Sequence, residues 1–328
     1  MDTSNVGVLR VQLADRRERL QQTIAGSHDT ARLIHLLKEV ESALKRIDAG
    51  SYGICELCNE PIEQEYLQHD PLVRVCLGHL SDQQQRAIER DLDLAYRIQS
   101  NLLPSQHMSV NGWEVSYHYE PVGPVSGDYC DIVTPEVNGG DTYFFFGDVS
   151  GKGVAASLLM SHLHAIFRSL LATPLPLKQL IERANRVFSE STMSTQFATL
   201  LCGKLTRSGD MEICNAGHCP PFLVRGGKVT RIDSTGLPAG LSYTGEYEVQ
   251  KFRLSKGDTI FLYTDGLTEA RNGSEEQYGP EKLSTLLERH QTLSSQALID
   301  ACLQDVSTFR NGSPKVDDLT IMMLRRVE

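Results

Sequence analysis

The chain has 328 residues, of which 40% are hydrophobic, and its 42 acidic and 32 basic side chains give a formal net charge of −10. This length predicts two domains, or one large domain and a small one, with enough apolar residues for a packed core. The acidic balance argues against broad electrostatic binding to nucleic acid or to an anionic membrane. No apolar stretch approaches 18 residues and the N-terminus lacks a signal-peptide core, so we expect a cytoplasmic protein without membrane association.

The first 50 residues are predicted to form a helical hairpin. Apolar residues recur at helical spacing over residues 6–24 and again over residues 30–48, where the spacing is 4-3-4-3. Gly26-Ser27 lies between the two stretches and breaks the helical pattern. We expect the two helices to run antiparallel and to lead into the segment that follows.

Residues 51–81 contain two pairs of metal-ligating side chains, in the order Cys55, Cys58, Cys76 and His79. The pattern C-x2-C-x17-C-x2-H has the spacing of a tetrahedral zinc site. Four protein ligands leave no position for water, and a small polar segment with little core gains folding energy from the metal. We therefore predict one structural Zn²⁺. The other cysteines are interpreted as buried apolar residues: Cys130, Cys202, Cys214, Cys219 and Cys302.

The stretch ALKRIDAGSYGIC at residues 43–55, followed by Pro61-Ile62, is similar to the DksA/TraR-type zinc finger. His79 stands where most members have a fourth cysteine, which is a replacement that zinc accepts. In members that act on transcription, a long helical hairpin carries an acidic tip into RNA polymerase. The corresponding tip here is only residues 26–30, so binding to RNA polymerase or nucleic acid is not expected.

A third helix is predicted from Asp82 to Leu103, where Pro104 ends it. Its apolar seam again has 4-3-4-3 spacing and consists of Ile88, Leu92, Ala95, Gln99 and Leu102. Two heptads are too few to establish a coiled coil. The seam therefore leaves two interpretations open, a homodimer formed through this linker helix and simple packing on the next domain.

From Trp113 onward the pattern changes to strands. One pair of helical stretches interrupts them at residues 153–172 and 177–191, and a second pair at residues 280–290 and 294–309 precedes the last strand. Grouped strands with helices inserted in pairs predict a layered α+β fold rather than a regular βαβ alternation.

Four aspartate motifs lie beside the predicted strands. They are Ser126-Gly127-Asp128, Gly147-Asp148-Val149, Tyr263-Thr264-Asp265-Gly266 and Asp317-Asp318-Leu319-Thr320. A single Asp-Gly is ordinarily a turn. Aspartates at the ends of strands that share a sheet can converge, however, and Mg²⁺ and Mn²⁺ prefer oxygen-rich clusters. Four such motifs in order predict a divalent metal site.

Together with Asn215-Ala216-Gly217-His218, these motifs resemble the SpoIIE-type branch of the PPM metal-dependent serine/threonine protein phosphatases. The resemblance covers about residues 92–328 and departs at Ser126, where many members carry glycine. It implies a β-sandwich flanked by helix pairs, with two Mn²⁺ or Mg²⁺ ions at one end. The implied catalytic ligands are the carboxylates of Asp128, Asp148, Asp265 and Asp317 and the carbonyl of Val149. Asp318 remains the alternative to Asp317.

The implied reaction is phosphate hydrolysis by a water whose pKa is lowered between two metal ions bridged by Asp148. No Cys-x5-Arg motif occurs, so a cysteine nucleophile is not supported. Lys152 is either an exposed loop lysine or a group that attracts phosphate beside a helix N-terminus. His218 is either part of a turn or an acid.

The sequence favours a phosphatase that acts on phosphoserine or phosphothreonine and is regulated by its N-terminal zinc module. The resemblance implies a bacterial signalling phosphoprotein, with a STAS-type anti-sigma-factor antagonist as the default substrate. The alternatives are a catalytically idle interaction scaffold and a zinc-finger transcription regulator. The predicted organisation is a hairpin (1–50), a zinc finger (51–81), a linker helix (82–104) and a phosphatase domain (105–328).

Overall fold

A computed structural model describes residues 3–25, 31–136 and 140–328. The chain divides into two compact units, Met1–Asp91 and Leu92–Glu328. The boundary falls inside helix α4 (Asp82–Leu102), so the second unit begins before residue 105, where we placed the domain boundary. Among the described residues, no helix combines the length and the apolar character needed to cross a bilayer.

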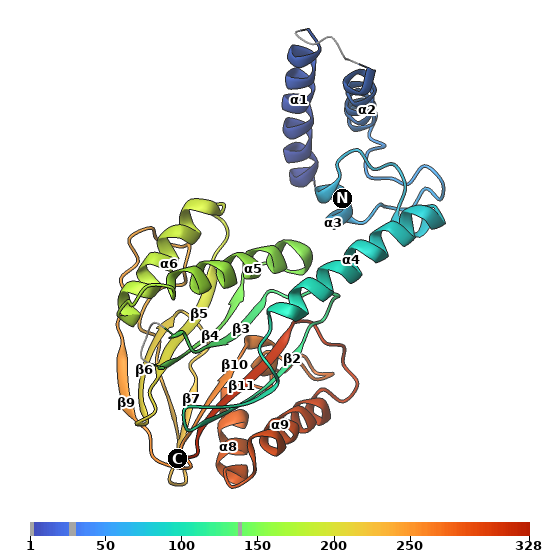
Figure 1. Ribbon diagram of the computed structural model, residues 1–328. Helices are drawn as coiled ribbons and strands as arrows, with labels where there is room; N and C mark the ends of the chain where they lie inside the picture. Colours follow the sequence, from blue (N-terminus) through green and yellow to red (C-terminus); the bar gives the residue numbers. More distant parts are fainter. Residues whose placement is uncertain (1–2, 26–30, 137–139) are drawn as a thin grey trace. The chain divides into compact units, whose positions relative to one another are not determined.

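The first unit contains the predicted helical hairpin (Figure 1). Helices α1 (Thr3–Ala25) and α2 (Ala31–Asp48) pack through Leu9 and Leu13 on one side and Val40 and Leu44 on the other. The predicted break at Gly26-Ser27 lies outside the described residues. Helix α3 (Gln64–His69) and a short 3-10 turn (Leu77–His79) complete this unit, and Cys55 and Cys76 belong to the same small core.

The second unit is a sandwich of two antiparallel sheets. The first sheet has the order β1 (His107–Val110), β2 (Trp113–Glu120), β11 (Leu319–Arg326), β10 (Thr259–Tyr263), β7 (Phe222–Arg225) and β8 (Lys228–Arg231). The second has the order β3 (Asp128–Val133), β4 (Thr142–Val149), β5 (Ala198–Leu205), β6 (Asp210–Ala216) and β9 (Gln250–Arg253). We did not predict β1 and β8, which are short edge strands with little buried apolar pattern.

Helix pairs cover the outer faces of the two sheets, which confirms the predicted layered α+β fold (Figure 1). Helices α5 (Gly153–Leu170) and α6 (Leu177–Ser191) pack on the second sheet, and α8 (Pro280–His290) and α9 (Ser295–Arg310) pack on the first. The run from Tyr143 to Phe146 in β4 is apolar because both faces of this strand are buried. Because side chains alternate along a strand, Phe145 faces the α5–α6 layer, whereas Phe144 faces the interior of the sandwich.

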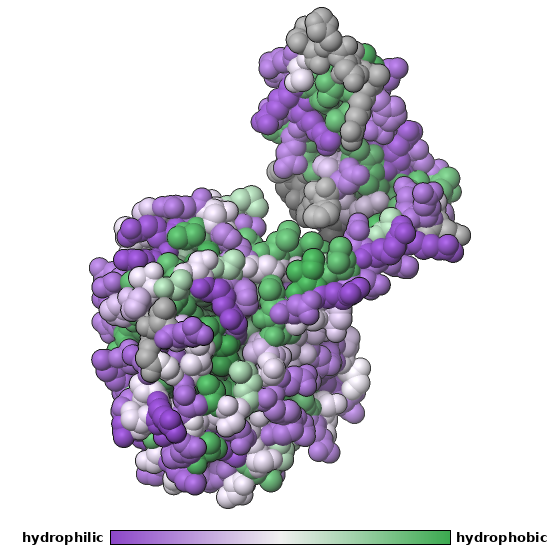
Figure 2. All heavy atoms as spheres, in the orientation of Figure 1, coloured by the Kyte–Doolittle hydropathy of each residue, from purple (hydrophilic) through white to green (hydrophobic). Residues whose placement is uncertain are grey.

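The predicted seam of α4 is, from Leu92 onward, the face that is turned inward. Leu92, Ala95 and Leu102 are partly buried and Gln99 is only 4% exposed. Packing on the neighbouring domain was therefore the correct interpretation for this part of the helix. Apolar surface is left on another side of α4, where Leu94 and Ile98 are more than half exposed. Figure 2 shows hydrophobic residues gathered where α4 and the end of α5 lie.

Candidate active site

Asp128 and Asp148 meet because β3 and β4 are antiparallel neighbours in which these two residues are direct cross-strand partners. Asp128 begins β3 and Asp148 lies next to the end of β4, so both carboxylates are at the same end of the second sheet. A side chain at Gly127 would place its Cβ only 3.0 Å from the carbonyl oxygen of Val149. Glycine at this position therefore allows the Val149 carbonyl to approach the Asp128 segment.

Asp265 and Asp317 occupy the equivalent end of the first sheet. Asp265 begins the short helix α7 (Asp265–Thr268) directly after β10, and Asp317 comes two residues before β11, the antiparallel neighbour of β10. Gly266 is required between them, since a Cβ there would collide with the backbone of Asp318.

Two threonines at β10 and β11 of the first sheet bind an aspartate of the second sheet. The hydroxyls of Thr264 and Thr320 donate hydrogen bonds of 3.0 and 2.5 Å to Oδ2 of Asp128. Thr264 follows β10 and Thr320 lies in β11, so the first sheet orients a carboxylate of the second. We predicted no role for these threonines, although both belong to the aspartate motifs. Their contacts depend on sheet packing, which local sequence does not report.

The carboxylates repel one another. Burial, followed by the charges of Asp265 and Asp317, raises the pKa of Asp148 to about 7. Burial and then Asp148 raise the pKa of Asp128, and burial and then Asp317 raise that of Asp265. Buried oxygen ligands that carry uncompensated negative charge fit hard divalent cations. Among the described residues, no three of these aspartates have carboxylate oxygens that all lie within 4.8 Å of one another, as the ligating atoms of the Cys55 group do.

The burial of Asp148, together with the repulsion from its neighbours, should make the stability of the metal-free protein depend on pH. The folded chain holds a proton on Asp148 up to about pH 7, whereas the unfolded chain loses it near its ordinary pKa of about 4. This contribution to stability is complete below about pH 4 and is lost as the pH rises through about 7. In chelator, we expect Asp148→Asn to melt at a higher temperature than the parent at pH 8. The difference should shrink toward pH 5; equal melting temperatures at pH 8, measured by circular dichroism, would contradict the repulsion.

Asp317 and Asp318 differ in their partners. Both oxygens of Asp318 accept backbone hydrogen bonds, from Val122 N at 2.7 Å and Gly127 N at 3.1 Å. Oδ2 of Asp317 instead pairs with Nζ of Lys152 at 3.0 Å. Lys152 also donates to the Val316 carbonyl at 2.6 Å, so its ammonium group lies beside the aspartate cluster.

His218 is buried within a turn. The side chain of Asn215 accepts a hydrogen bond from the His218 backbone N–H at 2.8 Å and donates one to the His218 carbonyl at 3.1 Å. The ring Nε2 lies 3.1 Å from the Tyr263 carbonyl and therefore carries the proton, and Nδ1 accepts from the Thr199 hydroxyl at 2.8 Å. Burial lowers the pKa of His218 to about 4, so the ring is neutral at pH 7. This arrangement favours the interpretation of His218 as part of a turn over its interpretation as an acid in the reaction.

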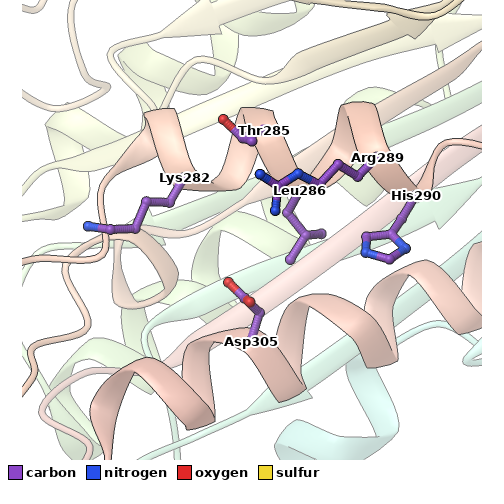
Figure 3. A pocket seen from close by; sticks show the side chains of 6 residues that line it. All are labelled: Lys282, Thr285, Leu286, Arg289, His290 and Asp305. Carbon is purple, nitrogen blue, oxygen red and sulfur yellow. The ribbon is translucent and has the colours of Figure 1, made fainter.

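A cavity of about 240 Å³ adjoins the aspartates, with a lining that comprises Asp148, Ser150, Phe197, Thr199, Gly217, His218, Cys219 and Asp265. A second cavity, of about 270 Å³, lies between α8 and α9. Figure 3 shows Asp305 of α9 facing the side chains of α8 across this space. None of the predicted site residues lines the second cavity, so the first is the candidate substrate site.

The predicted zinc ligands also come together. The sulfurs of Cys55, Cys58 and Cys76 and a ring nitrogen of His79 all lie within 4.8 Å of one another. Sγ of Cys76 is 3.1 Å from Nδ1 of His79 and 3.9 Å from Sγ of Cys58. Three thiolate sulfurs and an imidazole nitrogen are a donor set that suits Zn²⁺.

Residues 138–327 match the family described as Stage II sporulation protein E (SpoIIE). The chain belongs to the SpoIIE family. Among relatives of this SpoIIE-family chain, the phosphoserine phosphatase RsbU of Bacillus subtilis is 26% identical over 74% of the chain and 72% of RsbU. Protein IcfG of Synechocystis sp. is 26% identical over 72% of the chain, which spans only 41% of IcfG.

Solved structures give the same fold for this SpoIIE-family chain. The SiaA-PP2C domain of Pseudomonas aeruginosa aligns with a TM-score of 0.63 and 19% identity, covering 74% of the chain and 98% of that domain. The RsbU and RsbW domains of Rv1364c from Mycobacterium tuberculosis align with a TM-score of 0.56 and 26% identity, over 66% of the chain and 61% of that structure. The second unit therefore has a PP2C-like fold.

Proposed function

We propose that this SpoIIE-family chain is a metal-dependent protein serine/threonine phosphatase. The observation that carries the proposal is the meeting of aspartates from both sheets at one end of the sandwich, beside a cavity of about 240 Å³. The name of the relative RsbU, a phosphoserine phosphatase, supports the same activity. Retention of a carboxylate in all four motifs argues against the idle-scaffold alternative.

In this proposal, two Mn²⁺ or Mg²⁺ ions are held by the four carboxylates of Asp128, Asp148, Asp265 and Asp317 and by the carbonyl of Val149. When bound, such ions activate a water and neutralise phosphoryl charge. We assign Asp317 rather than Asp318 as the ligand. Both oxygens of Asp318 are held by backbone N–H groups of a distant segment, whereas Asp317 accepts one backbone hydrogen bond from its neighbour Asp318 and otherwise pairs with the exposed side chain of Lys152.

The chain's own residues prepare the site for a phosphorylated side chain. Thr264 and Thr320 fix the orientation of the Asp128 carboxylate. The ammonium group of Lys152 supplies positive charge at the start of α5, where free backbone N–H groups favour a phosphate. Neutral His218 orients the Thr199 hydroxyl at the cavity wall.

The proposed substrate is a phosphoserine- or phosphothreonine-containing bacterial signalling protein of the STAS-type anti-sigma-factor antagonist class. Two relatives support this class: RsbU is named a phosphoserine phosphatase, and the Rv1364c structure joins an RsbU domain to an RsbW domain. The cavity that Ser150 helps to line can admit a side chain presented by another protein.

The N-terminal unit is proposed to be a DksA/TraR-type zinc finger that holds one structural Zn²⁺ and regulates the phosphatase. The convergence of Cys55, Cys58, Cys76 and His79 supports the metal site. Helix α4 continues without a break from Asp82 in this unit into the second unit, so it can transmit a displacement. A second copy of the chain is the proposed partner of the exposed apolar side of α4, at Leu94 and Ile98.

Hydrolysis of p-nitrophenyl phosphate and of a phosphoserine peptide by the purified chain tests the proposed activity. We expect turnover of both with Mn²⁺ or Mg²⁺, loss of turnover in chelator, and recovery on adding Mn²⁺ back. Zn²⁺ should not substitute, because Mn²⁺ and Mg²⁺ suit oxygen ligands whereas zinc favours nitrogen and sulfur. A chain that binds Mn²⁺ but hydrolyses neither compound would be the idle scaffold instead.

A further inference from the structure

Gln99 is a buried amide of α4 that forms two hydrogen bonds with a single residue. Its Nε2 donates to the Ser126 carbonyl at 2.7 Å, and its Oε1 accepts from the Ser126 N–H at 3.0 Å. Gln99 is 4% exposed and Ser126 is fully buried, whereas the neighbours Ile98 and Ser100 are exposed. The Gln99 amide therefore bonds to both the N–H and the carbonyl of Ser126, as a neighbouring β-strand would. Because the pair is buried, water cannot take the place of these hydrogen bonds.

Ser126 leads directly into the aspartate site. Its hydroxyl accepts a hydrogen bond of 3.0 Å from the backbone N–H of Asp128. The N–H of the intervening Gly127 donates to Asp318 at 3.1 Å. The backbone of Ser126 and Gly127 is thus held by side chains from two other parts of the sequence, Gln99 and Asp318. A shift of Ser126 would displace Asp128.

We propose that Gln99 is a positioning residue that fixes the segment from Ser126 to Asp128 and thereby sets the affinity of the site for its metal ions. This inference rests on the proposed function, since it concerns the same aspartates. Side chains that orient metal ligands typically change metal affinity or activity by about 10–100-fold when they are replaced. Because α4 begins in the first unit, the Gln99–Ser126 pair is also the contact through which a movement of this helix would reach Asp128.

Replacement of Gln99 by methionine removes both hydrogen bonds while keeping the length of the side chain. The matched control is Gln83→Leu, at an exposed glutamine of the same helix. Mn²⁺ binding to each full-length protein is measured by isothermal titration calorimetry, at a temperature where circular dichroism shows it to be folded. We expect Gln99→Met to weaken Mn²⁺ binding by about 10-fold or more, and Gln83→Leu to stay within twofold of the parent.

The kinetic arm uses p-nitrophenyl phosphate. At a fixed, subsaturating Mn²⁺ concentration Gln99→Met should lose turnover, and saturating Mn²⁺ should restore most of it with little change in KM. Light scattering on each variant shows whether a change in oligomeric state accompanies the effect. If Gln99→Met does not fold, Gln99→Asn, which is one methylene shorter and cannot reach both Ser126 groups, takes its place.

An unchanged Mn²⁺ affinity in folded Gln99→Met, even with a lower melting temperature, would overturn the inference and leave Gln99 as a packing residue only. A change in mass that fully accounts for the change in affinity would overturn it as well. A failure of the proposed function can be told apart from a failure of this inference. If the parent binds Mn²⁺ but hydrolyses no substrate, the Mn²⁺ affinities of Gln99→Met and of the parent can still be compared. A parent that binds no Mn²⁺ overturns both.

Discussion

Asp265→Asn should remove at least ~99% of the Mn²⁺-dependent phosphatase activity, and Asp148→Asn should do the same. A 100-fold loss corresponds to about 2.7 kcal/mol of transition-state stabilisation. The loss of one negative charge from the proposed ligands is sufficient for such a loss of activity, because it weakens both metal binding and the neutralisation of the phosphoryl group by the metal ions. The fold should survive, since asparagine has the same size and removes a charge that its neighbours repel.

Steady-state hydrolysis of p-nitrophenyl phosphate over a range of Mn²⁺ concentrations measures this effect, with circular dichroism as the check on folding. Asp300→Asn is the control, because Asp300 is an exposed residue of α9 whose carboxylate is hydrogen-bonded to Gln296. It should retain parental activity. Parental activity in folded Asp265→Asn would show that the carboxylate is not a catalytic ligand.

The first unit should carry about one Zn²⁺ per chain and should depend on it for folding. Its apolar core is small and includes two of the predicted ligands, Cys55 and Cys76. Structural zinc in small domains contributes an apparent binding free energy of about 10–16 kcal/mol near neutral pH, which such a core cannot replace. Cys58→Ser is therefore expected to release the zinc and to unfold the segment around residues 51–81.

Elemental analysis after mild chelation measures the zinc content, and limited proteolysis reports unfolding of the first unit. The catalytic ions should be removed under these conditions while the zinc is retained. Cys219→Ser, which changes a thiol in the second unit, should keep one zinc per chain. Protein prepared with ample zinc that nevertheless contains none would exclude the site.

The convergence of the four proposed zinc ligands was predictable because the geometry within each pair is local. Two ligands separated by two residues need only a tight turn, and the backbone supplies it where Asn59 N–H bonds to the Cys55 carbonyl and His79 N–H to the Cys76 carbonyl. The aspartate motifs could be recognised in the sequence for a similar reason, since each joins an apolar strand to a polar loop. The amino-acid sequence by itself therefore determined which residues are candidate ligands and which strands carry them.

The tertiary structure decided how these candidates meet. Asp128 and Asp148 lie in strands of one sheet, whereas Asp265 and Asp317 adjoin strands of the other, so their convergence depends on how the two sheets pack. The backbone N–H groups that bond to Asp318 and not to Asp317 lie almost 200 residues earlier in the chain, so local sequence could not reveal this difference between the two neighbours. The spacing of the α4 seam predicted an inward face, but only the fold placed Gln99 against Ser126. Periodicity reports that a side chain is buried, whereas its partner is set by contacts between residues that are distant in sequence.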